Sequence, residues 1–228
     1  MRKALPILAT ALLAAGVLAA RSIGVARAAP RPPLHTSTKA SAPFDDVIAE
    51  NMQQMMDEGR RTFRFDTFGD EAFWSDGLGL DRAIAGAKHG GVGDGVSPKT
   101  ALALGLKVDM DALPPAVVEA VKAGKVDMND PATTLTLIKL NAVLGVVGTF
   151  DGDRMTKVGL SCAVCHSTVD DAFAPGIGHR LDGWGNRDLN PGAIIAATPN
   201  VAIVAQQLKV DVATAKKVLN SWGPGRFD

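Results

Sequence analysis

The sequence predicts an all-α fold, in which a helical N-terminal region, residues 44–157, precedes a second helical region, residues 158–228. Apolar residues recur every three or four positions in residues 44–61, which is the spacing of one face of a helix. Proline, serine or aspartate stands before several later apolar runs, as is typical where helices begin. The chain closes with two further runs of helical spacing.

The first predicted helix, residues 44–61, carries an apolar stripe with charged residues on its other face. The stripe consists of Val47, Ile48, Met52, Met55 and Met56. We interpret it as the core-facing side of an amphipathic helix. Caps and apolar spacing predict later helices at residues 98–104 after Ser97, 115–122 before Gly124, 132–147 after Asp130, 199–208 after Thr198, and 211–222 with Asp211 as cap.

The N-terminus has the pattern of a secretory signal peptide at residues 1–28. Met1-Arg2-Lys3 is followed by an apolar run, and Ala26-Arg27-Ala28 offers a cleavage site with small residues. A retained membrane anchor is the alternative, since the run is near the lower length limit for a span. Residues 29–43 are rich in proline, serine and threonine and are predicted to be a linker. We therefore expect an exported protein without a membrane span after cleavage.

The composition excludes some classes of protein. Twenty-four basic and 24 acidic residues give a formal net charge of zero. A nucleic-acid binder would carry a basic excess, so nucleic acid is not an expected partner. The chain contains no tyrosine, which excludes haem chemistry that depends on a tyrosine.

Two segments before residue 100 have unusual composition. Residues 59–74 contain four of the eight phenylalanines beside Trp74. Such density suits either a lid over a flat apolar group or a small aromatic core. Residues 86–97 are rich in glycine, but their spacing is not that of a phosphate-binding loop. His89 within them is interpreted mainly as a solvated histidine.

Both cysteines of the chain, Cys162 and Cys165, stand in a Cys-x-x-Cys pair with His166 directly after it. This arrangement is typical of a c-type haem attachment site. The two thiols bond to the haem, and the adjacent imidazole is placed to ligate the iron. Three alternatives stay open: a thioredoxin-like redox pair, a zinc site completed by His166 and His179, and a plain disulfide. The first lacks a clear strand–helix unit before Cys162, and the second lacks a standard spacing.

On this motif the chain resembles the c-type cytochromes, in particular the larger bacterial periplasmic ones. The resemblance implies one covalent haem c, a periplasmic location, and a cytochrome c-like helical haem region at residues 158–228. It also implies that the loop of residues 174–192 lies near the haem edge. Arg180 and Arg187 are candidate partners of the haem propionates, because guanidinium pairs well with carboxylate. Trp184 is a further candidate donor or packing residue.

The second axial ligand of the iron is less clear. Small cytochromes c use a methionine downstream of the motif, but here no methionine follows Met155. His179 is the first candidate and Met155 the second, with Met110, Met128 and the methionines of residues 44–61 as upstream choices. A different ligand or a vacant position stays open.

These features predict a periplasmic cytochrome that transfers electrons to and from redox partner proteins. A peroxidase-like haem enzyme is the first alternative, but it would need an acid–base pair near the iron and usually a second haem. A haem-bearing subunit of a larger redox complex is the second alternative. The sequence predicts neither the oligomeric state nor the redox potential.

Overall fold

The computed structural model describes residues 44–226. The chain divides into Met1–Asp45 and a compact unit, Asp46–Asp228. The predicted signal peptide, residues 1–28, and the predicted linker, residues 29–43, lie outside the described residues.

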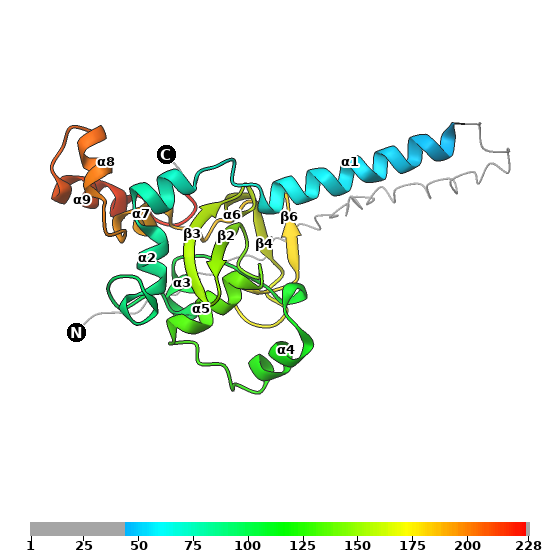
Figure 1. The fold of residues 1–228 in the computed structure, drawn as a ribbon, viewed down its shortest axis with the longest axis horizontal. Coiled ribbons are helices and arrows are strands. Elements are labelled where there is room, and N and C mark those ends of the chain that lie inside the picture. Colours follow the sequence, from blue (N-terminus) through cyan, green and yellow to red (C-terminus); the bar gives the residue numbers. More distant parts are fainter. Residues whose placement is uncertain (1–43, 227–228) are drawn as a thin grey trace, which may run out of the picture. The chain divides into compact units, whose positions relative to one another are not determined.

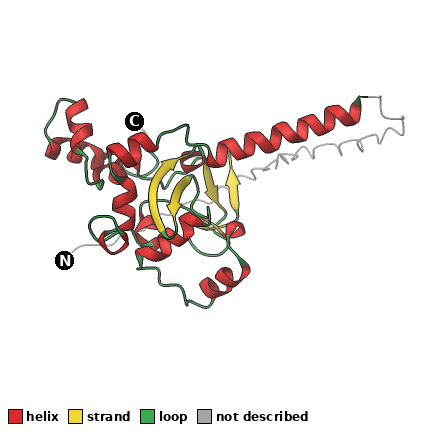
Figure 2. Ribbon diagram, in the orientation of Figure 1, coloured by secondary structure: helices red, strands yellow, loops and turns green. Residues whose placement is uncertain are grey.

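The prediction of an all-α fold is wrong. Of the described residues, 49% are helical and 14% are in strands, so the fold is mixed α/β. The strands form three two-stranded sheets, β1 with β5, β2 with β3, and β4 with β6. Figure 2 shows these short strands interleaved with helices rather than separated from them.

The largest sheet is an antiparallel hairpin of β2 (Val146–Asp151) and β3 (Arg154–Leu160), with Val146 opposite Leu160. Gly152 and Asp153 form its turn, since Asp151 pairs with Arg154, and an Asp-Gly step such as Asp151-Gly152 is a strong hairpin signal. The helix predicted at residues 132–147 included Val146 and Val147, which belong to β2 in the structure. Helix α5 (Pro131–Lys139) instead ends before Asn141, whose φ of 55° leaves the helical region.

The two smaller sheets join segments that are distant in the sequence. Strand β1 (Val108–Asp109) pairs in parallel with β5 (Ile177–Gly178). Strand β4 (Ser167–Val169) pairs antiparallel with β6 (Arg180–Asp182). Strands of two or three residues carry little sequence pattern of their own, so helical spacing elsewhere outweighed them in the prediction.

Most predicted helices are present, and several predicted caps are confirmed. Ser97, Asp130 and Asp211 each accept a hydrogen bond from a backbone N–H in the first turn of the following helix. The cap predicted at Thr198 is wrong, because its hydroxyl donates back to Ile195 and the helix begins only at Ala202. The helices and helical turns not yet given are η1 (Ala72–Gly77), α2 (Leu80–Ala85), η2 (Ala87–His89), α3 (Pro98–Ala103), η3 (Met110–Ala112), α4 (Pro115–Lys122), α6 (Ala163–His166), α7 (Pro191–Ala196), α8 (Ala202–Gln207) and α9 (Val212–Trp222).

The main hydrophobic core lies between α2, α5 and the β2–β3 hairpin, which Figure 1 shows side by side. Its buried members come from residues 80–177, on both sides of the domain boundary predicted at residue 157. That boundary falls inside β3. A second, smaller cluster of Ala196, Val201 and Leu219 holds the last three helices together.

Helix α1 (Asp45–Phe65) agrees with the predicted first helix, but none of its residues is buried. The interpretation of its apolar stripe as core-facing is therefore wrong. Within residues 44–226, no helix is long and apolar enough to cross a membrane.

Candidate haem-attachment site

The Cys-x-x-Cys-His motif forms the single turn of α6, between β3 and β4. Cys162 is the residue before this turn and is exposed, while Cys165 is half-buried, and both thiols are free. His166 ends the turn and is exposed. One side of the motif thus faces the protein interior and the other faces solvent.

The geometry weakens the alternatives for the two cysteines. A strand does precede the motif, contrary to expectation, but α6 is one turn long and β4 pairs with β6 rather than with β3. A thioredoxin-like βαβ unit is therefore absent here. Across residues 44–226, no group of three or more His, Cys, Asp or Glu side chains is placed to hold a metal ion.

The strand end before the motif is held in place by three hydrogen bonds from distant segments. The Ser161 backbone N–H donates to the Gly145 carbonyl at 2.9 Å, and the Ser161 hydroxyl donates to the Arg64 carbonyl at 2.7 Å. The Leu160 N–H donates to the Asp70 carboxylate at 3.0 Å. These bonds fix the position of the backbone directly before Cys162.

The loop after β6 holds the motif from its other side. The Gly183 N–H donates to the His166 carbonyl, and the Asn186 N–H donates to the Cys165 carbonyl, both at 2.8 Å. The Asn186 side chain, which is 2% exposed, donates to the Gly105 carbonyl at 2.9 Å. Sequence reasoning missed Asn186, and its only signal was an amide within a glycine-rich turn.

An apolar cavity of about 220 Å³ opens beside Cys165 in the middle of the core. Apolar side chains from most elements of the core line it, namely Trp74, Leu80, Ile84, Val96, Ala101, Leu104, Leu106, Ile138, Val143, Val146, Leu160, Val164, Leu189, Pro191 and Ile194. Its polar groups are few. The Thr134 hydroxyl has no hydrogen-bond partner, and Asp70 accepts from the indole N–H of Trp74 at 2.8 Å. Burial raises the pKa of both the Cys165 thiol and the Asp70 carboxyl.

The aromatic block around residues 63–74 only partly contributes to this cavity. Trp74 lines it and packs edge-on against Phe73, with ring centroids 5.0 Å apart. Phe68 is 73% exposed, so the block is not a closed aromatic core.

His179 lies outside the Cys165 cavity. It directly precedes Arg180, the first residue of β6, and its carbonyl accepts a hydrogen bond from the Asp170 backbone N–H. Asp170 stands four residues after His166. At roughly 3.3 Å per residue, the four steps from His166 to Asp170 cover about 13 Å along β4. The exposed surface here is polar. His179 Nδ1 forms a hydrogen bond with the Asp111 carboxylate at 2.9 Å, and this bond raises the pKa of the imidazole.

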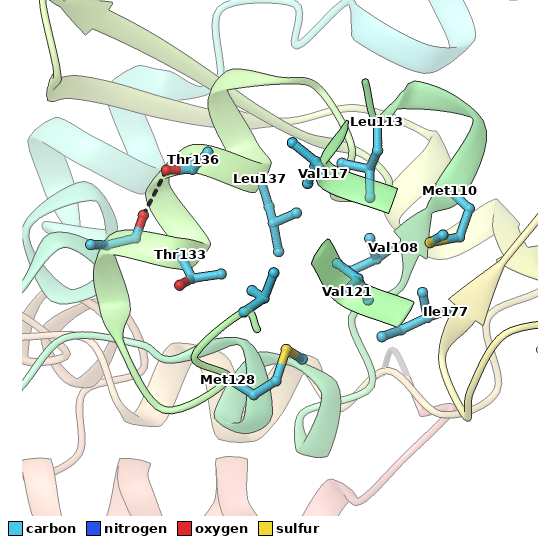
Figure 3. Close-up of a pocket in the computed structure, with 12 residues that line it drawn as sticks. Val108, Met110, Leu113, Val117, Val121, Met128, Thr133, Thr136, Leu137 and Ile177 are labelled. Carbon is cyan, nitrogen blue, oxygen red and sulfur yellow. Dashed lines mark hydrogen bonds between the residues drawn. The ribbon is translucent and has the colours of Figure 1, made fainter. Parts of the chain in front are cut away.

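The methionine and histidine alternatives are also elsewhere. Met155 is buried in the main core. Met110 and Met128 line a separate apolar cavity of about 250 Å³ between α4 and α5 (Figure 3). His89 lines a third pocket, which Lys139 also lines. The structure thus brings none of the candidate second ligands into the Cys165 cavity.

Arg180 lies in a buried charge cluster behind the motif. Its side chain is 5% exposed, and Nε donates to Asp182 at 2.6 Å. Arg64 and the Ser167 hydroxyl donate to the same carboxylate, at 2.7 and 2.8 Å. Burial alone would raise the pKa of Asp182, but these donors together hold it below its usual value. No local sequence signal points to Arg64, Ser167 or Asp182 as members of this cluster.

One donor of this cluster is unused, since Arg180 Nη2 is buried and has no hydrogen-bond partner. The other two predicted contact residues are on the surface. Trp184 is 66% exposed and directly follows Gly183, whose N–H donates to the His166 carbonyl, so the Trp184 backbone lies next to the residue that contacts the motif. Arg187 is exposed in the same loop.

No protein-family model matches this chain, and no curated protein or solved structure matches it either. The site is therefore defined by its own geometry: two free thiols in one turn, an adjacent histidine, an apolar cavity and an unpaired guanidinium nitrogen.

Proposed function

We propose that this chain is a covalent haem-binding protein, with haem c attached to Cys162 and Cys165. The observation that carries the proposal is that Cys165 lines the hollow apolar core while Cys162 and His166, in the same turn, are exposed. A flat apolar group bonded to both thiols would fill apolar space on one side and reach solvent on the other.

The chain's own residues fit such a group. The cavity lining is apolar, as a porphyrin requires, and burial raises the pKa of its Cys165 thiol. Arg180 does not line this cavity, but its Nη2 is an unused donor of the kind that a propionate carboxylate would take. His166 would ligate the iron, with Trp184 and Arg187 as further contacts at the exposed edge. Bound haem would supply a one-electron couple between ferrous and ferric iron.

Within this class we propose an exported electron carrier that exchanges electrons with redox partner proteins. The exposed side of the motif would leave a haem edge accessible to a partner. The only titratable side chains that line the cavity within residues 44–226 are Cys165 and Asp70. Asp70 already accepts two hydrogen bonds, so the acid–base pair that a peroxidase needs has no evident counterpart there. Export to the periplasm rests on the signal-peptide pattern of residues 1–28.

The first test asks whether haem is attached. The chain is produced in a host with haem-attachment machinery, denatured and run on a gel that is stained for haem. We expect the natural chain to stain and the double variant Cys162→Ser/Cys165→Ser to remain unstained. An unstained natural chain contradicts haem attachment. Rapid peroxide turnover by the native haem-bearing protein contradicts the proposal that it is an electron carrier.

A second prediction concerns the other face of the iron, for which we propose His179. This residue lies outside the Cys165 cavity, so it could ligate only a haem that projects from the cavity on the exposed side of the motif. Its Nδ1 bonds Asp111, and a carboxylate on the second ring nitrogen is typical of histidine ligands. His179→Ala is expected to convert a low-spin absorption spectrum into a high-spin one. His89→Ala is the control and should leave the spectrum unchanged. If both variants keep the natural spectrum, His179 is not the ligand.

A further inference from the structure

The apolar cavity between α4 and α5 has no part in the proposed haem site. Its volume is about 250 Å³, and it shares no lining residue with the Cys165 cavity. Close-packed protein interiors hold few voids larger than a water molecule. A cavity of this size with apolar walls is the usual form of a small-molecule site. The α4–α5 cavity is therefore a candidate ligand site in its own right.

The walls of the α4–α5 cavity come from the main core and from α4, and Figure 3 shows their side chains around an open centre. Five of them belong to the buried main core, namely Val108, Met110, Leu113, Leu137 and Ile177. Val117 and Val121, about one turn apart on α4, also line it, although α4 has no buried residue. Ala116 and Glu119 on the same helix are exposed. Helix α4 thus turns an apolar face to the cavity and another face to solvent.

The α4–α5 cavity offers no free side-chain hydrogen-bonding group to a ligand. Among the described residues, Thr133 and Thr136 are the only polar ones that line it. The Thr133 hydroxyl donates to the Asp127 carbonyl at 2.9 Å, and the Thr136 hydroxyl donates to the Ala132 carbonyl at 3.0 Å. Burying a charge or an unpaired polar group costs free energy. The walls therefore favour a ligand that is uncharged and apolar throughout.

The volume of the α4–α5 cavity limits the size of this ligand. An apolar protein cavity of about 150 Å³ takes a benzene molecule. By that ratio, a volume of about 250 Å³ takes roughly ten non-hydrogen atoms, the size of two fused aromatic rings. Met110 and Met128 line the cavity, and their unbranched side chains adapt to the shape of an occupant. A peptide fits poorly, since its backbone N–H and C=O groups would find no partners in these walls.

Apolar contacts alone hold α4 against the rest of the unit. Val117 and Val118 pack on the main core. The hydrogen bonds of residues 114–126 stay within that range, such as the bond from Lys122 to Glu119 at 3.0 Å. Within residues 47–226, no hydrogen bond or ion pair joins this range to another part of the chain. A segment held in this way opens at lower free energy than the bonded elements of the core. Helix α4 can therefore move aside to admit a ligand.

We propose that the α4–α5 cavity binds a small, uncharged apolar molecule of about two fused rings in size, with α4 as its lid. The apolar face of α4 covers the bound molecule, and the core side chains contact it from the other walls. This site does not depend on haem, since it uses neither the cysteine motif nor the Cys165 cavity.

The first test measures binding of naphthalene to the full chain by equilibrium dialysis. We expect a dissociation constant of about 100 μM or tighter for the natural chain. Val121→Phe and Val117→Phe each place a larger side chain in the cavity from α4, and each is expected to weaken binding at least about tenfold. Ala116→Phe adds the same side chain on the exposed face of α4 and is the control, which should bind as the natural chain does.

Two outcomes of the dialysis overturn the proposal. A natural chain that takes up no naphthalene has no such site. If both filling variants bind naphthalene as tightly as the Ala116→Phe control, the molecule occupies a different cavity, such as the one beside Cys165.

A charged analogue tests the class of ligand. The anion 2-naphthoate carries the same two rings with a carboxylate, for which the cavity walls offer no partner. We expect it to bind at least about tenfold more weakly than naphthalene. Equal or tighter binding of 2-naphthoate overturns the assignment to uncharged molecules.

Hydrogen exchange tests the lid. Naphthalene is expected to slow the exchange of backbone amides in α4 and to leave those of α9, which does not line the cavity, unchanged. If α4 exchanges at the same rate with and without naphthalene, α4 is not the lid of the site.

Discussion

Gly145→Ala is expected to lower the free energy of unfolding by about 3 kcal/mol or more, and to reduce the yield of haem-bearing protein. Gly145 has a φ of +70°, a region that costs other residues about 1–2 kcal/mol. A Cβ atom there would also lie 2.0 Å from the backbone nitrogen of Val164, inside the motif turn. Because that atom belongs to the backbone, the contact is relieved only by moving the turn that carries both cysteines.

Gly152→Ala is the matched control. Gly152 also has a positive φ, +59°, but a Cβ atom added there meets nothing within 4 Å. We expect a loss of about 1 kcal/mol from the backbone conformation alone. Chemical denaturation of the two variants separates the cost of the backbone conformation from that of the close approach. Equal losses would show that the approach of Gly145 to the motif is unimportant.

Asp182→Ala is expected to lower the free energy of unfolding by about 3 kcal/mol, because it leaves a buried guanidinium without its carboxylate. The Arg180 side chain is 5% exposed, and Asp182 is its partner at 2.6 Å. The same carboxylate holds Arg64 at the end of α1 and the Ser167 hydroxyl directly after His166. The variant is therefore also expected to loosen the segment that carries the motif.

Two comparison variants identify the cause of this loss. Asp76→Ala removes an ion pair with Lys157, in which both side chains are exposed, and should cost much less than Asp182→Ala. Arg180→Met/Asp182→Leu removes both charges of the pair and is expected to recover part of the loss, because Arg64 and the Ser167 hydroxyl still lose their acceptor. If the double variant is as unstable as Asp182→Ala, an unpaired guanidinium is not the cause.

The same carboxylate predicts a pH dependence. Its pKa in the folded protein lies below the ordinary value of 3.8. A lowered pKa contributes stability that is fully present above the unfolded-state pKa and is lost as the pH falls through the folded-state pKa. The natural chain should therefore lose this contribution below about pH 4, and Asp182→Ala should lack that part of the acid transition.

The helices were predictable where their signals are local. Ser97, Asp130 and Asp211 cap the first turns of their own helices, and these bonds span two or three residues. The strands were not predictable in the same way. Strand β4 is three residues long and is defined by its pairing with β6, whose residues lie 11 to 15 positions after their partners in the chain. Only β2 and β3 had a local signal, the Asp151-Gly152 turn, and the helical interpretation of residues 132–147 obscured it.

The sequence by itself determined the cysteine motif, the neighbouring histidine and the starts of α1, α3, α4, α5 and α9, because adjacent residues, apolar spacing and cap bonds carry that information. The tertiary structure decided what surrounds the motif. Gly145, Asn186 and Asp182 contact it or the residues beside it through backbone approach and buried hydrogen bonds, and the bond from Arg64 to Asp182 joins residues 118 positions apart. The cavity beside Cys165 likewise exists only where six or more segments meet. Such contacts depend on how the whole chain packs, and no local spacing encodes them.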